Sequence, residues 1–352
     1  MSAWRLAAIL LAWGVLGLGA AQGIEQDRRG LATITDSRVS EASGMVLSTE
    51  EPGHVYLIND SGNDPVVFVV EVATGAVVGT TALSGVELLD PEALALTADG
   101  QLLIADIGDN GEDRAEVALL AIEQPGPGDA TVVPTVFRVR YSDGPADAEG
   151  VLIEPGGRVL IATKGTFGGG EVLALPESLP ATVPDGELSV ARPLGVETPA
   201  LVTDSATLPD GSGAVLRTYG RVYVYQLPSW ELVHEDDLPR TQQGETLALY
   251  ADGRSALVGS EGSPSPLIRV QLPDVTEPAA DPSAEPSDPT AATPTGSAHD
   301  PRDSASPDDG GDGSGIPSSL RAAGGAGVVA LLLGAVLVLY RRRQQRTPPP
   351  QR

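Results

Sequence analysis

The chain has 352 residues, which is enough for one large domain or two modest ones. It contains no cysteine, so disulfides and thiolate chemistry are excluded, and any metal must be held by oxygen or imidazole. The formal net charge is −26. Nucleic acid is therefore excluded as a partner, because a phosphate backbone would be repelled.

The first segment, residues 1–23, predicts a secretory signal peptide. Arg5 precedes an apolar stretch from Leu6 to Leu18, and small residues follow at Ala20, Ala21 and Gly23. An uncleaved N-terminal anchor is the alternative.

Residues 24–273 read almost entirely as strands and turns. Short β-branched or alternating segments are bounded by Gly, Pro or Asp, and no helical period of useful length appears. The clearest of these segments are Val66 to Val72, Glu116 to Ile122, Val136 to Tyr141, Leu188 to Arg192, Val222 to Gln226 and Leu267 to Leu272. The pattern predicts an all-β head.

Within this head one phrase recurs five times: a carboxylate, an apolar strand, a Gly-containing turn and a second apolar strand. The copies begin at Glu41, Glu92, Glu149, Asp204 and Glu245. They lie between 41 and 57 residues apart, the spacing of propeller blades of about four strands. We therefore predict a β-propeller of five blades, with six as an alternative. A β-sandwich or two separate β domains is the competing fold.

The ends of the head are expected to meet. The last repeat has only one clear further strand, Leu267 to Leu272, and the segment Leu31 to Asp36 can complete its sheet. Such pairing would tie the ring shut.

The repeated acids are the candidate metal ligands. Because the innermost strands of a propeller line its channel, we expect Glu41, Glu92, Glu149, Asp204 and Glu245 to surround one axis. Clustered carboxylates raise one another's pKa unless a cation lies among them. Oxygen ligands without Cys or a His pair suit Ca²⁺, and Mg²⁺ less well. Alternatively, these acids hydrogen-bond backbone amides and join neighbouring blades.

Two loops after second strands form a candidate ligand-binding rim. NDSGND begins at Asn59 and DIGDNGED begins at Asp106, and both loops are expected on the same side of the ring. Their candidate ligand-binding residues are Asn59, Asp60, Asp106, Asp109 and Asn110. Asn, Asp and Gly also form tight turns through bonds to their own backbone, which is the structural alternative.

Two cations are expected beside the acids. Lys164 is the only lysine among 22 basic residues, which favours a role for a compact ammonium, either pairing with the acids or contacting an anionic ligand. Arg217 stands near the equivalent point of the fourth repeat. Chance retention of the lysine is the alternative.

Residues 274–319 are Pro, Ala, Ser, Thr, Asp and Gly with hardly any large apolar residue, so they predict a disordered stalk. The uncharged run Ala322 to Tyr340 is about long enough to cross a hydrocarbon core of ~30 Å. The tail, residues 341–352, begins with three arginines, which predicts a cytoplasmic C-terminus. The expected product is a single-pass membrane protein with an extracellular head.

Several phrases resemble a family of uncharacterised exported bacterial β-propellers: INDSG from Ile58, DIGDN from Asp106, ATK ending at Lys164, LRTY from Leu216 and QGETLA from Gln243. The resemblance covers nearly all of the head and neither the stalk nor the anchor. More distantly, the scheme is similar to phytase-like, TolB-like and gluconolactonase-like propellers, some of which hold calcium in a central channel. The resemblance implies a propeller from a bacterium and transfers no catalytic residue.

Enzyme signatures are thin, since the chain has no GxSxG, HExxH or phosphate-binding glycine loop. We therefore expect a membrane-anchored module that binds or senses an extracellular ligand or protein, stabilised by calcium. A Ca²⁺-dependent hydrolase of lactonase or phosphoesterase type is the alternative. A purely structural surface module is the third.

Overall fold

A computed structural model describes residues 29–166, 168–179 and 188–273. These residues form 21 β-strands and no helix. The predicted signal peptide, stalk and C-terminal apolar run all lie outside this part of the chain. Within it, no helix has the length and hydrophobicity needed to span a membrane.

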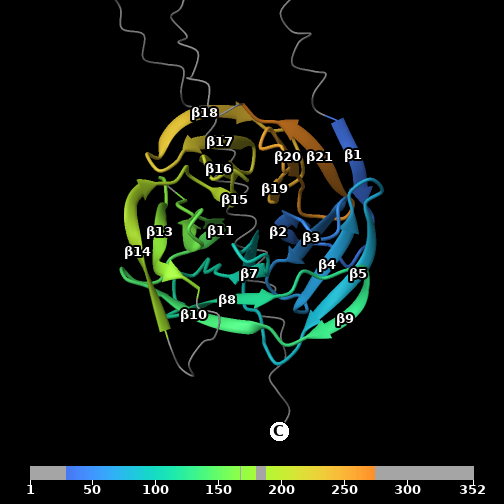
Figure 1. Cartoon of the computed structure of the whole chain (residues 1–352), viewed down its shortest axis with the longest axis horizontal. Helices are drawn as coiled ribbons and strands as arrows, with labels where there is room; N and C mark the ends of the chain where they lie inside the picture. Colours follow the sequence, from blue (N-terminus) through green and yellow to red (C-terminus); the bar gives the residue numbers. More distant parts are fainter. Residues whose placement is uncertain (1–28, 167, 180–187, 274–352) are drawn as a thin grey trace, which may run out of the picture. The chain divides into compact units, whose positions relative to one another are not determined.

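The strands fall into five antiparallel groups, here called blades 1 to 5 (Figure 1). Blade 1 contains β2 (Ala42–Leu47), β3 (His54–Asn59), β4 (Val66–Glu71) and β5 (Ala76–Leu83). Blade 2 contains β6 (Pro91–Leu96), β7 (Leu102–Asp106), β8 (Val117–Ile122) and β10 (Thr135–Tyr141). Blade 3 contains β11 (Ala148–Ile153), β12 (Arg158–Thr163), β13 (Glu171–Ser178) and β14 (Leu188–Glu197).

The last two blades follow the same plan. Blade 4 contains β15 (Val202–Thr207), β16 (Gly213–Thr218), β17 (Arg221–Gln226) and β18 (Glu231–Asp237). Blade 5 contains β19 (Leu247–Leu249), β20 (Ser255–Val258), β21 (Ser265–Gln271) and β1 (Arg29–Ile34). Strand β1 pairs antiparallel with β21, from Arg29 opposite Arg269 to Ile34 opposite Ser265. The predicted joining of the two ends of the head is confirmed.

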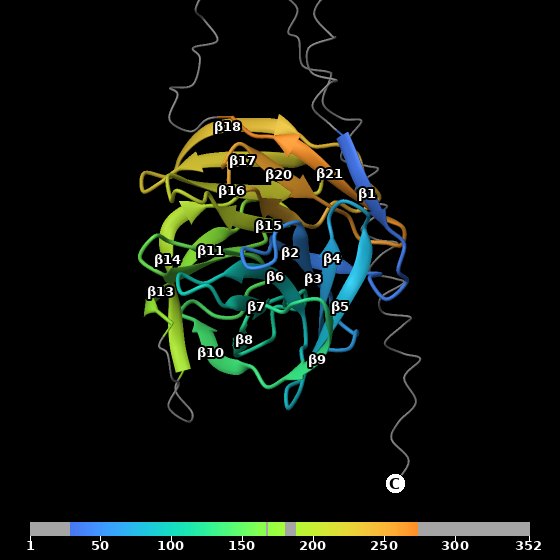
Figure 2. The ribbon, with the colours of Figure 1, turned by 45° about the vertical axis from the view of Figure 1, so that its right-hand side comes forward.

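The blades are arranged as a ring. The innermost strands contact one another in a closed cycle, β2 with β6, β6 with β11, β11 with β15, β15 with β19, and β19 with β2. Figure 1 looks along the axis of this ring, and Figure 2 shows the sheets from a tilted direction. The described residues therefore form an all-β propeller-type fold. A sandwich of two facing sheets would not produce such a cycle.

Each sheet has a buried apolar surface on both sides, because it lies between two others. Strand β3 shows this directly: Val55 and Leu57 pack in the cluster shared by blades 5 and 1, whereas Tyr56 and Ile58 pack in the cluster shared by blades 1 and 2. Successive side chains of a strand point to opposite faces. The continuous apolar runs of the sequence thus reflect burial on both faces. Five apolar clusters, one between each pair of neighbouring blades, form the core.

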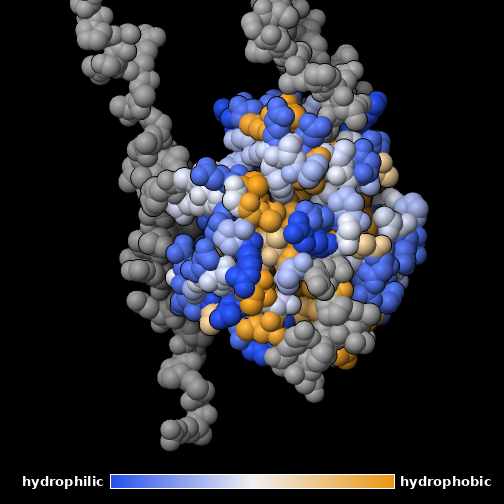
Figure 3. Space-filling view, turned by 60° about the vertical axis from the view of Figure 1, so that its left-hand side comes forward, coloured by the Kyte–Doolittle hydropathy of each residue, from blue (hydrophilic) through white to orange (hydrophobic). Residues whose placement is uncertain are grey.

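Two pairings depart from the simple plan. Strand β9 (Gly128–Val132) runs parallel to β5 and adds a fifth strand to blade 1. Strand β14 pairs in parallel with β10, so blades 2 and 3 form one eight-stranded sheet. Figure 3 views the side of the ring that carries β14, where hydrophobic residues lie between hydrophilic ones. Neither pairing was expected, because both join segments that the sequence shows only as isolated short strands.

Candidate functional site

The starts of the innermost strands carry most of the predicted metal ligands, and their register is irregular. In β6 the pairing with β7 shifts between Pro91 and Ala93, which leaves Glu92 as the extra residue. Glu149 is the extra residue of β11 in the same way. A β-bulge of this kind redirects one side chain and ends regular pairing.

The bulges show that the five repeated acids are not equivalent. The bulge residue is Ser43 in blade 1 and Thr203 in blade 4, so Glu41 and Asp204 occupy other positions. The expectation of one acid at the same point in every blade is therefore wrong. The repeats were aligned on their first carboxylate, and a bulge displaces such an alignment by one or two residues.

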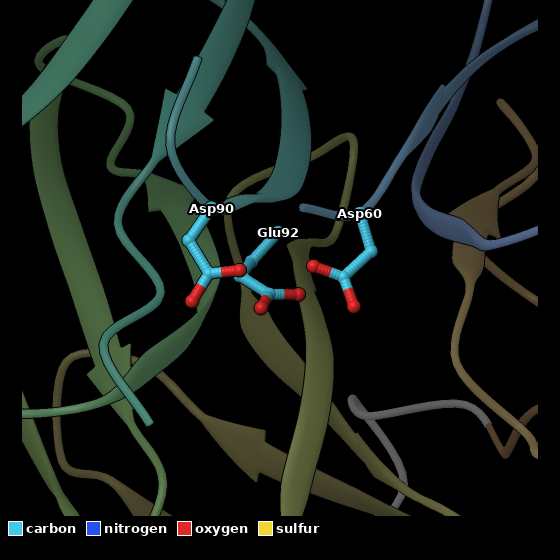
Figure 4. A group of neighbouring side chains, drawn as sticks. All are labelled: Asp60, Asp90 and Glu92. Carbon is cyan, nitrogen blue, oxygen red and sulfur yellow. The ribbon is translucent and has the colours of Figure 1, made fainter. Parts of the chain in front are cut away.

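The structure brings Glu92 together with two further carboxylates, Asp60 and Asp90. One carboxylate oxygen from each lies within 4.8 Å of the others. Asp60 follows β3 of blade 1, whereas Asp90 directly precedes β6 of blade 2 and Glu92 is the second residue of that strand. Figure 4 shows the three side chains pointing toward one another across this blade junction. We call these residues the acid cluster.

The surroundings of Asp90 and Glu92 favour the neutral forms of these two acids when no cation is bound. Burial, followed by the hydrogen bond and charge of Asp60, raises the pKa of Asp90 to about 8. Glu92 is only 4% exposed, and burial together with the charge of Glu149 raises its pKa well above the usual value. Ser43 Oγ donates a hydrogen bond to the Glu92 carboxylate. No arginine or lysine of the described chain forms an ion pair with the cluster.

The loop after β7 lies beside the acid cluster and forms hydrogen bonds to the backbone next to it. Asp106 accepts a hydrogen bond from the amide of Asp90 at 2.8 Å and pairs with Arg114 Nη1 at 3.1 Å. Arg114 also donates to the carbonyl of Gly108 at 2.6 Å. A Cβ on Gly108 would lie 2.6 Å from Glu92 Oε1, so a larger residue there would displace the carboxylates of the cluster. Asp106 thus positions the backbone beside the cluster and does not join it.

Other residues of the predicted ligand-binding rim form hydrogen bonds with backbone groups of the described chain. Asp109 accepts hydrogen bonds from the amides of Asp113 and Arg114, at 3.1 and 2.8 Å. Asn59 donates to the carbonyl of Arg38 at 2.7 Å. The Asp109 contacts match the turn-forming alternative, whereas Asn59 bonds a segment 21 residues away in the chain. Asn110 is exposed, and Glu41 accepts a hydrogen bond from Asn63 Nδ2 at 2.8 Å.

Lys164 forms an ion pair with Glu149, the repeated acid of blade 3. Its Nζ lies 2.5 Å from Glu149 Oε1 and 5.5 Å from the centre of the Tyr219 ring. Glu149 is buried, and burial is the main reason why its pKa rises to about 8, while Lys164 opposes the rise. The predicted pairing of this lysine with a repeated acid is seen in the structure.

Glu245 and Glu261 are two further acids whose pKa values are raised by burial. Gln243 Nε2 donates to Glu245 Oε1 at 2.9 Å, whereas the buried Oε2 has no hydrogen-bond partner in the described chain. Burial raises the pKa of Glu245 to about 8, with Lys164 opposing this shift. Burial also raises the pKa of Glu261 to about 7, and the charge of Asp60 adds to this increase.

Asp204 and Arg217 are buried and form hydrogen bonds with backbone groups at the start of blade 5. Asp204 is completely buried and accepts hydrogen bonds from the amides of Ser205 and Leu247, at 2.7 and 2.6 Å. The amide of Leu247 belongs to the next blade, so this carboxylate joins blades 4 and 5. Arg217 is also completely buried and donates to the Thr246 carbonyl. Burial lowers the pKa of Arg217 to about 10.

Charge compensation therefore differs around the ring. Lys164 and Arg217 lie on the side of Glu149, Asp204 and Glu245, whereas Asp60, Asp90 and Glu92 share no protein cation. Three converging carboxylates offer only oxygen ligands, as hard cations such as Ca²⁺ require. Backbone oxygens and water would complete the coordination. The residues present therefore fit a divalent cation at the acid cluster.

Sequence reasoning missed Asp90, Asp147 and Glu261. Asp147 accepts a hydrogen bond from the amide of Asp109 at 2.9 Å and lies two residues before Glu149. A signal was present, because Asp-x-Glu occurs at both 90–92 and 147–149. Each of these repeats begins at the second acid of the pair, so Asp90 and Asp147 lie just before the repeated phrase.

The buried acids predict an unusual pH dependence of stability. Glu149 and Glu245 have pKa values raised to about 8, and Glu261 to about 7, above those in the unfolded chain. The folded state therefore holds more protons than the unfolded state between about pH 4.5 and pH 8, and its stability falls as pH rises through that window. Denaturant unfolding in chelator at several pH values measures this, and Glu245→Gln should flatten the curve. Stability that rises across the window would contradict the assignment.

Comparisons with known proteins give distant similarity only. No protein-family model and no curated protein matches the chain. The aldose sugar dehydrogenase of Streptomyces coelicolor, in its PQQ-bound form, is 11% identical over 69% of this chain and 96% of its own, with a TM-score of 0.41. A gluconolactonase of Xanthomonas campestris is 12% identical over 65% and 72%, with a TM-score of 0.38. The Dos1 propeller structure is 15% identical with a TM-score of 0.35, and the match covers 63% of this chain and about half, 53%, of that chain.

Proposed function

We propose that the protein is a membrane-anchored extracellular propeller that binds a ligand or partner through the channel face carrying a divalent cation, most suitably Ca²⁺. The observation that supports this proposal is the convergence of Asp60, Asp90 and Glu92 without a protein counter-ion. The cation would neutralise the cluster, join blade 1 to blade 2 and present a positive centre in an acidic molecule. Lys164, beside Glu149, would be the second positive group for an external ligand.

A calcium-dependent hydrolase is the second candidate, and one observation favours it. Glu149 and Glu245 have pKa values of about 8, the range useful for proton transfer near neutral pH. Binding ranks first because both glutamates are buried and Glu149 is held by Lys164.

Calorimetry and turnover assays on the full-length protein separate the two functions. We expect one high-affinity calcium site per chain in the titration and no rapid turnover of lactones, phosphomonoesters or phytate in the presence of calcium. Absence of calcium binding would contradict the proposed site. Turnover that Glu149→Gln abolishes would replace the binding function with the hydrolase.

The proposed location follows from the segments at the two ends. Residues 1–23 would direct export, residues 274–319 would form a stalk, and residues 322–340 would anchor the chain with its arginines in the cytoplasm. External protease on intact cells should release a fragment containing residues 29–273 by cutting in the stalk. Full protection of residues 274–319 would contradict this orientation.

A further inference from the structure

The outer hairpin of blade 4, formed by β17 and β18, carries a row of aromatic and apolar side chains. Tyr223 and Tyr225 lie on one face of β17, because side chains two residues apart in a strand point to the same side. Leu232 of β18 lies directly opposite Tyr225 and therefore on the same face. Trp230 lies in the turn between the two strands, and the centre of its ring is 5.9 Å from that of Tyr225. We call these four residues the aromatic face.

The rest of the described chain covers the aromatic face only in part. Its inner side packs toward blade 3, and Tyr225 there is only 9% exposed. Leu232 is 45% exposed, whereas Tyr223 and Trp230 are half-buried. Strand β18 is the last strand of its sheet and lies at the outer rim of the ring (Figure 1), and no other described strand pairs with it. The outer part of the face is therefore accessible to a partner.

Trp230 has a backbone conformation that bulky residues rarely adopt. Its φ of 57° lies in the left-handed region, where Cβ crowds the following carbonyl oxygen. Glycine or asparagine would form such a turn with less strain. Strained residues persist where the surrounding structure holds them, and they cluster at functional sites. This conformation therefore supports a function for the Trp230 ring beyond forming the turn.

The charges beside the aromatic face favour a cationic partner. Strand β18 contains four acids and neither lysine nor arginine. Arg221 lies at one end of the face, 5.7 Å from the centre of the Tyr223 ring, and it pairs with Glu235 and Asp237. The whole chain has a formal net charge of −26. A positively charged segment would be attracted to this rim, whereas the chain's own acidic residues 274–319 would be repelled.

We propose that the aromatic face binds a proline-rich segment of another protein that carries arginine or lysine beside its prolines. Its proline rings pack against Tyr223, Trp230 and Leu232. Its cationic side chains lie beside Glu235, which is on the same face because it is directly opposite Tyr223. Such a segment is extended before it binds, so it loses little conformational entropy. The aromatic face shares no residue with the acid cluster, so this function goes beyond the proposed cation site and does not depend on it.

Calorimetry with three synthetic peptides tests the proposal on the full-length protein. The peptide RPPPRPPPR carries both features, RAAARAAAR keeps the charge without proline, and EPPPEPPPE keeps the prolines with the opposite charge. We expect the first peptide to bind and each of the others to bind at least about tenfold more weakly. No heat with millimolar RPPPRPPPR, or equal affinity for RAAARAAAR, would overturn the proposal. Equal or tighter binding of EPPPEPPPE would also overturn it and would favour residues 274–319 as the occupant.

Two variants locate the binding surface. Trp230→Gly removes the ring and retains the backbone conformation without strain, so it should bind RPPPRPPPR at least about tenfold more weakly. Leu232→Ser should bind about threefold more weakly, and it should melt close to the wild type because Leu232 is exposed. Tyr250→Ala is the matched control, since Tyr250 is also half-buried and has Arg269 4.1 Å from the centre of its ring. Unchanged affinity in both variants, or an equal loss in Tyr250→Ala, would overturn the assignment of this face.

Discussion

Calcium is expected to raise the melting temperature of the full-length protein, and Glu92→Gln should abolish most of this response. A cation that binds the folded state alone stabilises it by about 2.7 kcal/mol when its free concentration is 100 times the dissociation constant. Glu92 supplies one of the three converging carboxylates, so its amide would leave a weaker site. Thermal unfolding with chelator and with excess calcium measures the difference.

The same variant should have the opposite effect in chelator. Without a cation, Glu92 is a buried acid whose ionised form is opposed by burial and by the charges of Glu149, Asp60 and Asp90. Its replacement by glutamine should therefore leave the chelated protein as stable as the wild type or more stable. Glu50→Gln is the matched control, because Glu50 is exposed and lies outside the cluster. Equal calcium responses in the wild type and in Glu92→Gln would refute the cation site.

Arg217→Met is expected to lower the free energy of unfolding by about 3 kcal/mol, because loss of one partner leaves buried charge uncompensated. Arg217 is completely buried, and Glu245 and Asp204 are the acids whose charges favour its ionised form. The variant also leaves the Thr246 carbonyl without this donor. Chemical denaturation in urea measures the loss.

Two companion variants identify the cause of that loss. Arg217→Met combined with Glu245→Gln should recover part of the stability, since the uncompensated carboxylate is removed with the cation. Arg221→Met is the control on the next strand, where the arginine side chain is 43% exposed and pairs with Glu235 and Asp237. It should change stability little. A comparable loss in Arg217→Met and Arg221→Met would contradict a special role for the buried guanidinium.

The acid cluster has a structural consequence for the ring. Asp60 belongs to blade 1, whereas Asp90 and Glu92 belong to blade 2. Between blades 4 and 5 the corresponding link is internal, because Asp204 accepts a hydrogen bond from the Leu247 amide. A bound cation at the acid cluster would therefore link blade 1 to blade 2, as the hydrogen bond between Asp204 and the Leu247 amide links blade 4 to blade 5.

Much of the architecture could be predicted from the sequence. Recurrent strand pairs separated by Gly-containing turns predict repeated sheets, and the apolar runs, such as Val55 to Ile58, require burial on both faces. Strand β1 could be assigned to the last blade because that blade was one strand short in the sequence. Lys164 could be singled out by composition alone, and it does lie against a repeated acid.

The composition of the site depended on the tertiary structure, because bulges and strand pairing are not encoded by local spacing. Glu92 and Glu149 are bulge residues, whereas Glu41 and Asp204 are not, and no period in the sequence distinguishes them. Asp60 and Asp90 come together only because blade 2 follows blade 1 around the ring. The sequence by itself determined that acids recur at the starts of inner strands. Only the packing of the blades decided which of them converge in the acid cluster, which pair with Lys164 and which, like Asp204, bind backbone amides.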